Sequence, residues 1–141
     1  MVVRMKLPHK ISYTNSVKGG DSKLWFIRIN PKHQYDTGLH AHEYEHVVQW
    51  HKMTLMFTVL VLGLSAIYSQ ELLYLMPLVI LPHGLAYTYI TKYRQYCEVK
   101  AFKKLLKHNT NEGDLDFFAE YLASNYNLSL RVEEAKKLLS E

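Results

Sequence analysis

The chain has 141 residues, of which 48% are apolar, so it is long enough for one compact domain with its own core and too short for two ordinary domains. Its single cysteine, Cys97, excludes an internal disulfide framework and is compatible with a reducing compartment. The formal net charge is +4, but the basic residues are spread along the chain and form no recognised motif, so we expect no nucleic-acid partner.

Residues 1–35 predict a small antiparallel sheet. Two β-prone runs, at 11–14 and 24–29, lie on either side of the glycine pair at 19–20, which is typical of a turn. Apolar residues alternate with others in the second run, which predicts one buried face. Pro31 ends this run, because proline has no N–H to donate to a neighbouring strand.

Residues 36–52 predict a helix, with Asp36 or Thr37 as its N-cap, that carries the sequence HEYEH. His42 and His46 are four residues apart, so their imidazoles lie on one helix face and can converge on one ion. This HExxH spacing offers two nitrogen donors to Zn²⁺ and places a carboxylate beside the position where a water would bind. A solvated helix face that is rich in histidine by chance is the alternative.

Residues 53–91 form two charge-free arms, which only Glu71 separates. Each arm approaches the ~20 residues that a bilayer span needs, and an apolar helix of this kind must lie in a core or in lipid. Basic residues flank the outer ends of both arms, as the positive-inside rule requires of a hairpin with both ends in the cytoplasm (Lys52, Lys92 and Arg94). Two prolines interrupt the second arm, so a buried hydrophobic hairpin is an equal alternative.

Residues 92–108 predict an amphipathic helix, and residues 113–141 predict two short C-terminal helices. If the apolar arms fold back on each other, Glu98 comes to the same level as His46. Catalytic zinc takes three protein ligands, and Glu98 is the only carboxylate between residues 72 and 111. The alternative for Glu98 is a solvated ion pair with a neighbouring basic residue.

Two motifs together resemble a known family. An HExxH helix followed by a later helix with Glu98–Val99–Lys100–Ala101 is similar to the paired HExxH and ExxxA motifs of the gluzincin class of zinc metallopeptidases. The order of the whole chain resembles the smallest gluzincins and the short HExxH proteins of phages and prophages over most of its length. It runs from WFIRINPKHQYDTGLHAHEYEHVVQW through the apolar hairpin and YRQYCEVKAF to NLSLRVEEAKKLL.

The resemblance implies an α+β, zincin-like fold with Zn²⁺ held by His42, His46 and Glu98. It also selects Glu43 as the general base, whereas helical geometry alone places Glu43 and Glu45 symmetrically, each ~80° from the midline of the two histidines. Glu45 is then expected to be a surface group or to orient an imidazole.

The resemblance also implies a substrate strand beside an edge strand, with Trp25, Ile27 and Ile29 as the contacting residues. A further hydrogen-bond donor to the oxyanion is usual in the class. Tyr93 and Tyr96 are the first candidates, and His83 and Arg94 are others.

The expected function is that of a zinc-dependent metalloendopeptidase that hydrolyses an amide bond in a peptide or in peptidoglycan. The alternatives are a non-catalytic phage structural or assembly protein and a membrane-anchored factor, each with a structural zinc site. The basic start MVVRMKLPHK has no apolar stretch after it, so we expect no signal peptide. The protein is accordingly expected in the cytoplasm, at the cytoplasmic membrane through residues 53–91, or in a virion.

Overall fold

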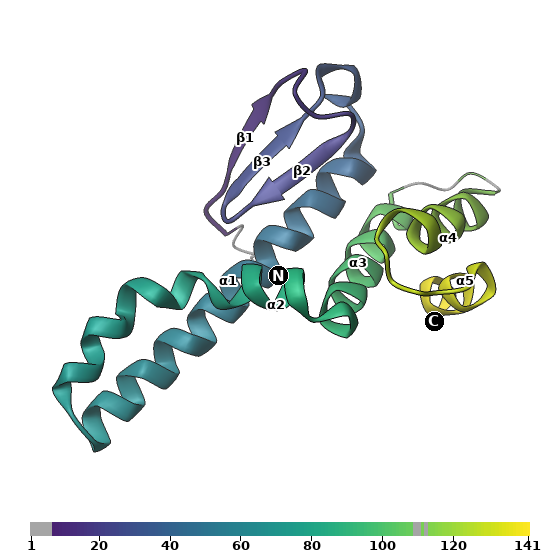
Figure 1. Ribbon diagram of the computed structural model, residues 1–141. Coiled ribbons are helices and arrows are strands. Elements are labelled where there is room, and N and C mark those ends of the chain that lie inside the picture. Colours follow the sequence, from purple (N-terminus) through teal and green to yellow (C-terminus); the bar gives the residue numbers. More distant parts are fainter. Residues whose placement is uncertain (1–6, 109–110, 112) are drawn as a thin grey trace, which may run out of the picture.

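A computed structural model describes residues 7–108, 111 and 113–141 (Figure 1). It confirms an α+β architecture, with a three-stranded sheet near the N-terminus followed by helices. The strands are β1 (Lys10–Tyr13), β2 (Gly20–Lys23) and β3 (Phe26–Ile29). The helices are η1 (Pro31–His33), α1 (Thr37–Ile67), η2 (Gln70–Ile80), α2 (Pro82–Tyr89), α3 (Thr91–Leu106), α4 (Asp114–Asn125) and α5 (Val132–Ser140).

The sheet is mixed, so the expected antiparallel sheet is wrong. Its order is β1-β3-β2, in which β1 runs parallel to β3 and β2 runs antiparallel to it. The expected glycine turn is also misplaced, because Gly20 already belongs to β2 and the tight turn is Leu24–Trp25. The sequence GDSK of β2 has no apolar alternation to reveal a strand. An ion pair between Asp21 and its cross-strand partner Arg28 helps to hold it in register instead.

Helix α1 runs without a break from the HExxH motif into the first apolar arm. Asp36 is its N-cap, since the Asp36 side chain accepts a hydrogen bond of 2.9 Å from the backbone N–H of Leu39. The second arm is the 3₁₀ helix η2, which is bent by 54° relative to α2 at the break near Pro82. The expected boundary between residues 52 and 53 is therefore not a structural break.

The two arms form a hairpin that extends away from the sheet and from the C-terminal helices (Figure 1). Among the described residues of this hairpin, only Ser65 and Val79 are buried. The structure therefore does not bury the apolar hairpin in a core of this chain.

Helix α3 returns along α1 at the base of the hairpin, and α4 and α5 pack together next to it. This return brings the part of α3 that carries Glu98 beside the part of α1 that carries the histidines. A second contact fixes the sheet, because Ile27 and Ile29 of β3 are buried against Val47 of α1. The base of the hairpin is thus the point where sheet, α1, α2 and α3 meet.

Candidate metal centre

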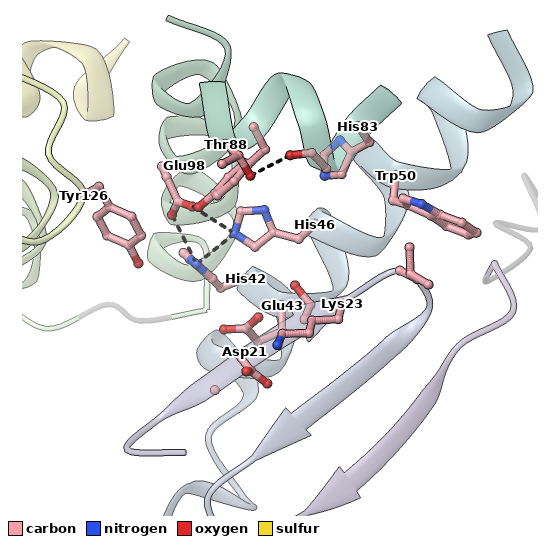
Figure 2. Close-up of a pocket in the computed structure, with 15 residues that line it drawn as sticks. Asp21, Lys23, His42, Glu43, His46, Trp50, His83, Thr88, Glu98 and Tyr126 are labelled. Carbon is pink, nitrogen blue, oxygen red and sulfur yellow. Dashed lines mark hydrogen bonds and ion pairs between the residues drawn. The ribbon is translucent and has the colours of Figure 1, made fainter. Parts of the chain in front are cut away.

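His42, His46 and Glu98 converge at one point between α1 and α3 (Figure 2). The two Nε2 atoms are 3.3 Å apart, Glu98 Oε1 is 3.5 Å from His46 Nε2, and Glu98 Oε2 is 3.7 Å from His42 Nε2. One ligand atom from each residue lies within 4.8 Å of the other two. This group could hold a metal ion, as the paired helices predicted.

The donor atoms have the burial and the charge that a cation site needs. His42 is 5% and Glu98 is 1% exposed, and among the described residues Glu98 Oε2 has no hydrogen-bond partner. An unsatisfied buried acceptor costs about 1–3 kcal/mol, more when it is charged, so a cation at this point would relieve it. Burial lowers the pKa of His42 to about 3, which keeps this imidazole neutral, as a metal ligand must be.

Glu98 remains ionised although it is buried. Burial by itself raises the pKa of its carboxyl group, but the hydrogen bond and the charge of His46, together with His42, outweigh this effect and lower it overall. The side chain of Tyr87 on α2 also donates a hydrogen bond to Glu98 Oε1. An anionic carboxylate is thus held against two imidazoles.

Gln49 joins the two helices and orients His46. Its Oε1 lies 3.1 Å from Nδ1 of His46, and its Nε2 donates a 3.0 Å hydrogen bond to the carbonyl oxygen of Cys97, next to Glu98. Glu45, the residue expected to lie at the surface or to orient an imidazole, has its Oε1 4.0 Å from Lys100 Nζ instead. The sequence spacing could have predicted this role of Gln49, because Gln49 follows His46 by three residues and so lies about one turn along the same helix face.

Glu43 lies beside the three donors, against the first residue of β2. A β-carbon added at Gly20 would lie 2.9 Å from both Cγ and Oε1 of Glu43, so any larger residue at position 20 would force the Glu43 side chain to move. Burial raises the pKa of Glu43 to about 7, although His46 and Ser22 act in the opposite direction. A carboxyl group that titrates near neutral pH can both accept and donate a proton there.

A pocket of about 630 Å³ opens over the three donors, between β2 and α2. All four residues of β2 line one wall, and Tyr87 and Thr88 of α2 line another. Tyr126, which directly follows α4, lines a third part of the wall (Figure 2). Burial raises the pKa of Tyr126, and the carboxylates of Glu98 and Glu43 add to this effect, so its hydroxyl stays protonated.

The tyrosines expected as oxyanion donors, Tyr93 and Tyr96, do not line this pocket in the described part of the chain. The hydroxyl of Tyr93 lies 2.9 Å from Nδ1 of His83, and Tyr96 is 55% exposed and accepts a hydrogen bond from Lys100. Tyr93 and Tyr96 point away from the pocket because they lie on a different face of α3 from Glu98. Tyr87 and Tyr126 occupy the pocket instead.

Arg94 positions the segments that carry both pocket tyrosines. Its guanidinium donates hydrogen bonds to the carbonyl oxygens of Tyr87 (3.0 Å), Thr88 (2.9 Å) and Tyr126 (3.3 Å). The guanidinium is therefore engaged with the backbone, and Arg94 does not line the pocket among the described residues. His83, the remaining candidate donor, does line it, although its Nδ1 faces Tyr93.

The expected substrate contacts at Trp25, Ile27 and Ile29 are wrong for the two isoleucines. Strand β3 is the central strand, and Ile27 and Ile29 are 1% and 0% exposed beneath the sheet. Trp25 lies in the turn before β3, where it is 39% exposed and its ring is 5.4 Å from that of Trp50. The edge strand beside the pocket is β2.

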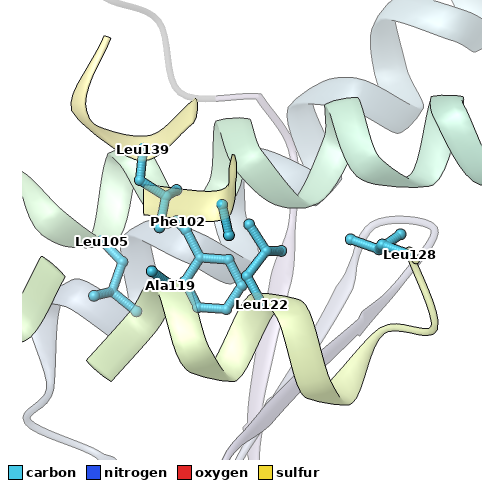
Figure 3. Close-up of a cluster of buried hydrophobic side chains, with 7 residues drawn as sticks. Phe102, Leu105, Ala119, Leu122, Leu128 and Leu139 are labelled. Carbon is cyan, nitrogen blue, oxygen red and sulfur yellow. The ribbon is translucent and has the colours of Figure 1, made fainter. Parts of the chain in front are cut away.

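The motif around Glu98 also departs from the family pattern. Ala101 follows Glu98 by three positions, whereas ExxxA places alanine at the fourth, which here is Phe102. Phe102 has a structural role: its ring centroid is 4.5 Å from that of His42, and its other side packs into the cluster formed by α4 and α5 (Figure 3). The C-terminal helices therefore support the candidate metal centre through Phe102.

Comparison of the chain with protein-family models, with curated proteins and with solved structures gives no match.

Proposed function

We propose that this protein is a zinc-dependent metallopeptidase with a zincin-like fold, in which His42, His46 and Glu98 hold the zinc and Glu43 is the general base. The observation that supports this proposal most is the convergence of two imidazoles and a carboxylate on the floor of an open pocket, with a second carboxylate beside them.

The number of donors favours a catalytic site over a structural one. Among the described residues the group has three members, and structural zinc sites are usually closed by four protein ligands. Two histidines and a glutamate are a known ligand set of catalytic zinc. Zinc bound there would lower the pKa of a water molecule and polarise the carbonyl group to be attacked.

The chain's own residues supply the proton transfers and the positioning. Glu43, with its pKa near 7, removes a proton from the attacking water and passes it to the leaving amine. Tyr126, whose hydroxyl stays protonated, donates a hydrogen bond to the carbonyl oxygen as negative charge develops there. Tyr87 holds the carboxylate of Glu98 in place.

The free edge of β2 favours an extended peptide as the substrate. Strand β2 pairs only with β3 within the described sheet, and its four residues line the pocket. A peptide that adds to such an edge is held by backbone hydrogen bonds along its length. The substrate is thus proposed to be a protein segment rather than a compact small molecule.

Two neighbouring glutamates provide a matched test. Glu43 and Glu45 are both buried in α1, at 4% and 6% exposure, but only Glu43 lines the pocket. We expect about one zinc per chain in the wild type and in both Gln variants, because neither residue is a ligand. Cleavage of a library of quenched fluorescent peptides should fall by about 10²–10⁴ in Glu43→Gln and stay near the wild-type rate in Glu45→Gln.

Two results would refute the proposal. The first is purified protein without zinc after expression in zinc-supplied cells. The second is a Glu43→Gln variant that is folded and cleaves as fast as the wild type.

A further inference from the structure

In the structure the apolar hairpin is shorter than the expected residues 53–91, because α2 borders the pocket; it spans residues 53–81 and has no part in the candidate metal centre. Its first arm is the C-terminal half of α1, and its second arm is η2. Glu71 at its tip is its only charged residue. Any function of this segment therefore depends on its exposed surface and on the partner that this surface contacts.

The apolar hairpin exposes large hydrophobic side chains along both arms. The most apolar 18-residue window of α1 has only 17% of its residues buried, whereas the core helix of a soluble domain is mostly buried. Several of its side chains are at least half exposed (Leu55, Met56, Val59, Leu60, Ile67, Tyr74 and Leu78). An exposed apolar surface of this extent marks an interaction site.

The distribution of these side chains favours a lipid bilayer over a groove of another protein as the partner of this surface. A helix that docks in a protein groove is apolar on one face and polar on the other, whereas a segment without a polar face is typical of lipid surroundings. Within the apolar hairpin no charged residue interrupts either arm, and the polar Ser65 is satisfied by the carbonyl oxygen of Leu62. The hairpin therefore has no charged face, and the hydroxyl residues of its first arm, Thr54, Thr58 and Ser65, share one side of α1.

The two ends of the apolar hairpin carry the side chains that suit the two edges of a bilayer. At its base, Lys52 directly precedes the first arm and provides positive charge for anionic headgroups, and the turn residue Trp25, whose ring lies beside that of Trp50 on α1, is 39% exposed. Near its tip, Tyr68 and Tyr74 are 76% and 85% exposed, and tyrosine and tryptophan are enriched at membrane–water interfaces.

The length of the apolar hairpin is sufficient to enter the hydrocarbon region. The 15 helical residues from 53 to 67 extend about 22 Å at 1.5 Å per residue, compared with a hydrocarbon core of about 30 Å. Local thinning of the bilayer accommodates segments that are somewhat short. Both ends of the hairpin leave on the same side, because both join the folded body (Figure 1).

We propose that the apolar hairpin inserts into a lipid bilayer and anchors the protein to an anionic membrane surface. The pocket then lies at this surface, because α2, which lines it, begins at Pro82, directly after the hairpin. This proposal does not depend on the peptidase proposal, since it rests on residues outside the metal centre.

Vesicle flotation of the full chain tests the anchor. The vesicles contain phosphatidylcholine with or without phosphatidylglycerol, and the matched variants are Val59→Lys on the hairpin and Phe117→Lys on α4, two sites that are 61% and 60% exposed. Wild type and Phe117→Lys should float with the anionic vesicles, and Val59→Lys should lose most of this binding. Circular dichroism checks that both variants fold.

Quenching by brominated lipids tests directly whether the apolar hairpin contacts the lipid acyl chains. Cys97 is fully buried, so a fluorophore can be attached to a cysteine introduced at residue 59 or 117. Vesicles of brominated phosphatidylcholine and phosphatidylglycerol should quench the label at residue 59 several-fold more than the label at residue 117.

Two outcomes would overturn the anchor proposal. One is a detergent-free monomer that neither floats nor shows quenching at residue 59. The other is a lipid-independent oligomer that Val59→Lys dissociates, which would assign the hairpin to contacts between copies of this chain. In either case the zinc content and peptidase activity would be unaffected.

Discussion

Gly20 of β2 and Glu43 of α1 are in such close contact that a β-carbon at residue 20 would lie 2.9 Å from the Glu43 side chain. The two residues are far apart in the sequence, and the sheet packing on α1 brings them together. The glycine thereby sets the position of the carboxylate that is proposed to act as the base.

Replacing this glycine should displace Glu43 without removing the metal. We expect Gly20→Ala to lower kcat/KM by roughly 10–100-fold, because small displacements of a catalytic group have large effects on rate. Zinc content should be unchanged, since the three ligands are untouched. The control is Gly19→Ala, where an added β-carbon meets no atom within 4 Å, and wild-type activity is expected. Equal activity in the two variants would contradict a positioning role for Gly20.

Gln49 offers a test of how the imidazole is oriented. Gln49→Leu removes the hydrogen bonds to His46 and to the backbone of Cys97, while the volume of the side chain is largely kept. Loss of such supporting contacts typically lowers metal affinity 10–100-fold, and we expect a change of this size in a competition titration with a zinc chelator. Glu45→Gln is the control, because Glu45 pairs with Lys100 and not with an imidazole. Wild-type affinity in Gln49→Leu would show that Gln49 does not orient His46.

Metal binding should release a proton at weakly acidic pH. Burial lowers the pKa of His46, but Glu98 outweighs burial and raises the pKa above its ordinary value of 6.5 in the metal-free protein. The metal-free His46 is thus more than half protonated at pH 6.5, and a cation must displace this proton, so affinity falls as the pH decreases. Calorimetric titration of zinc at pH 6.5 in two buffers with different ionisation enthalpies measures the release. The Glu43→Gln background excludes protons from Glu43, and identical heats in both buffers would refute the expectation.

A comparison of variants at Tyr126 and Tyr96 tests whether the pocket tyrosine, and not the exposed tyrosine on α3, takes part in catalysis. Tyr126→Phe should lower kcat by about 10²-fold with little change in KM, because its hydroxyl is proposed to stabilise charge that develops only in the transition state. Tyr96 is 55% exposed and bonds to Lys100, so Tyr96→Phe should retain full activity. The kcat and KM of both variants are measured with the same quenched fluorescent peptides. Loss of activity in Tyr96→Phe alone would reverse the assignment.

Local features of the sequence determined much of the helical part of this protein and the three residues that could hold a metal ion. The four-residue spacing of His42 and His46 follows from the helical repeat, and Asp36 caps this helix as a short polar side chain can. The fold-back of the charge-free arms predicted that Glu98 would meet the histidines, because two antiparallel segments of similar length place their outer ends together. These inferences need only the periodicity of a helix and the direction of the chain.

Only the tertiary structure decided which strand borders the pocket, which tyrosines line it and where the apolar surface lies. Strand β2 carries no apolar alternation, so its place depends on pairing with β3 and on packing against α1. Tyr126 reaches the pocket because α4 packs beside α3 and Arg94 binds the backbone of both pocket tyrosines. Such contacts join residues that are distant in the chain, and their energies depend on how whole elements pack, which no local pattern of residues encodes.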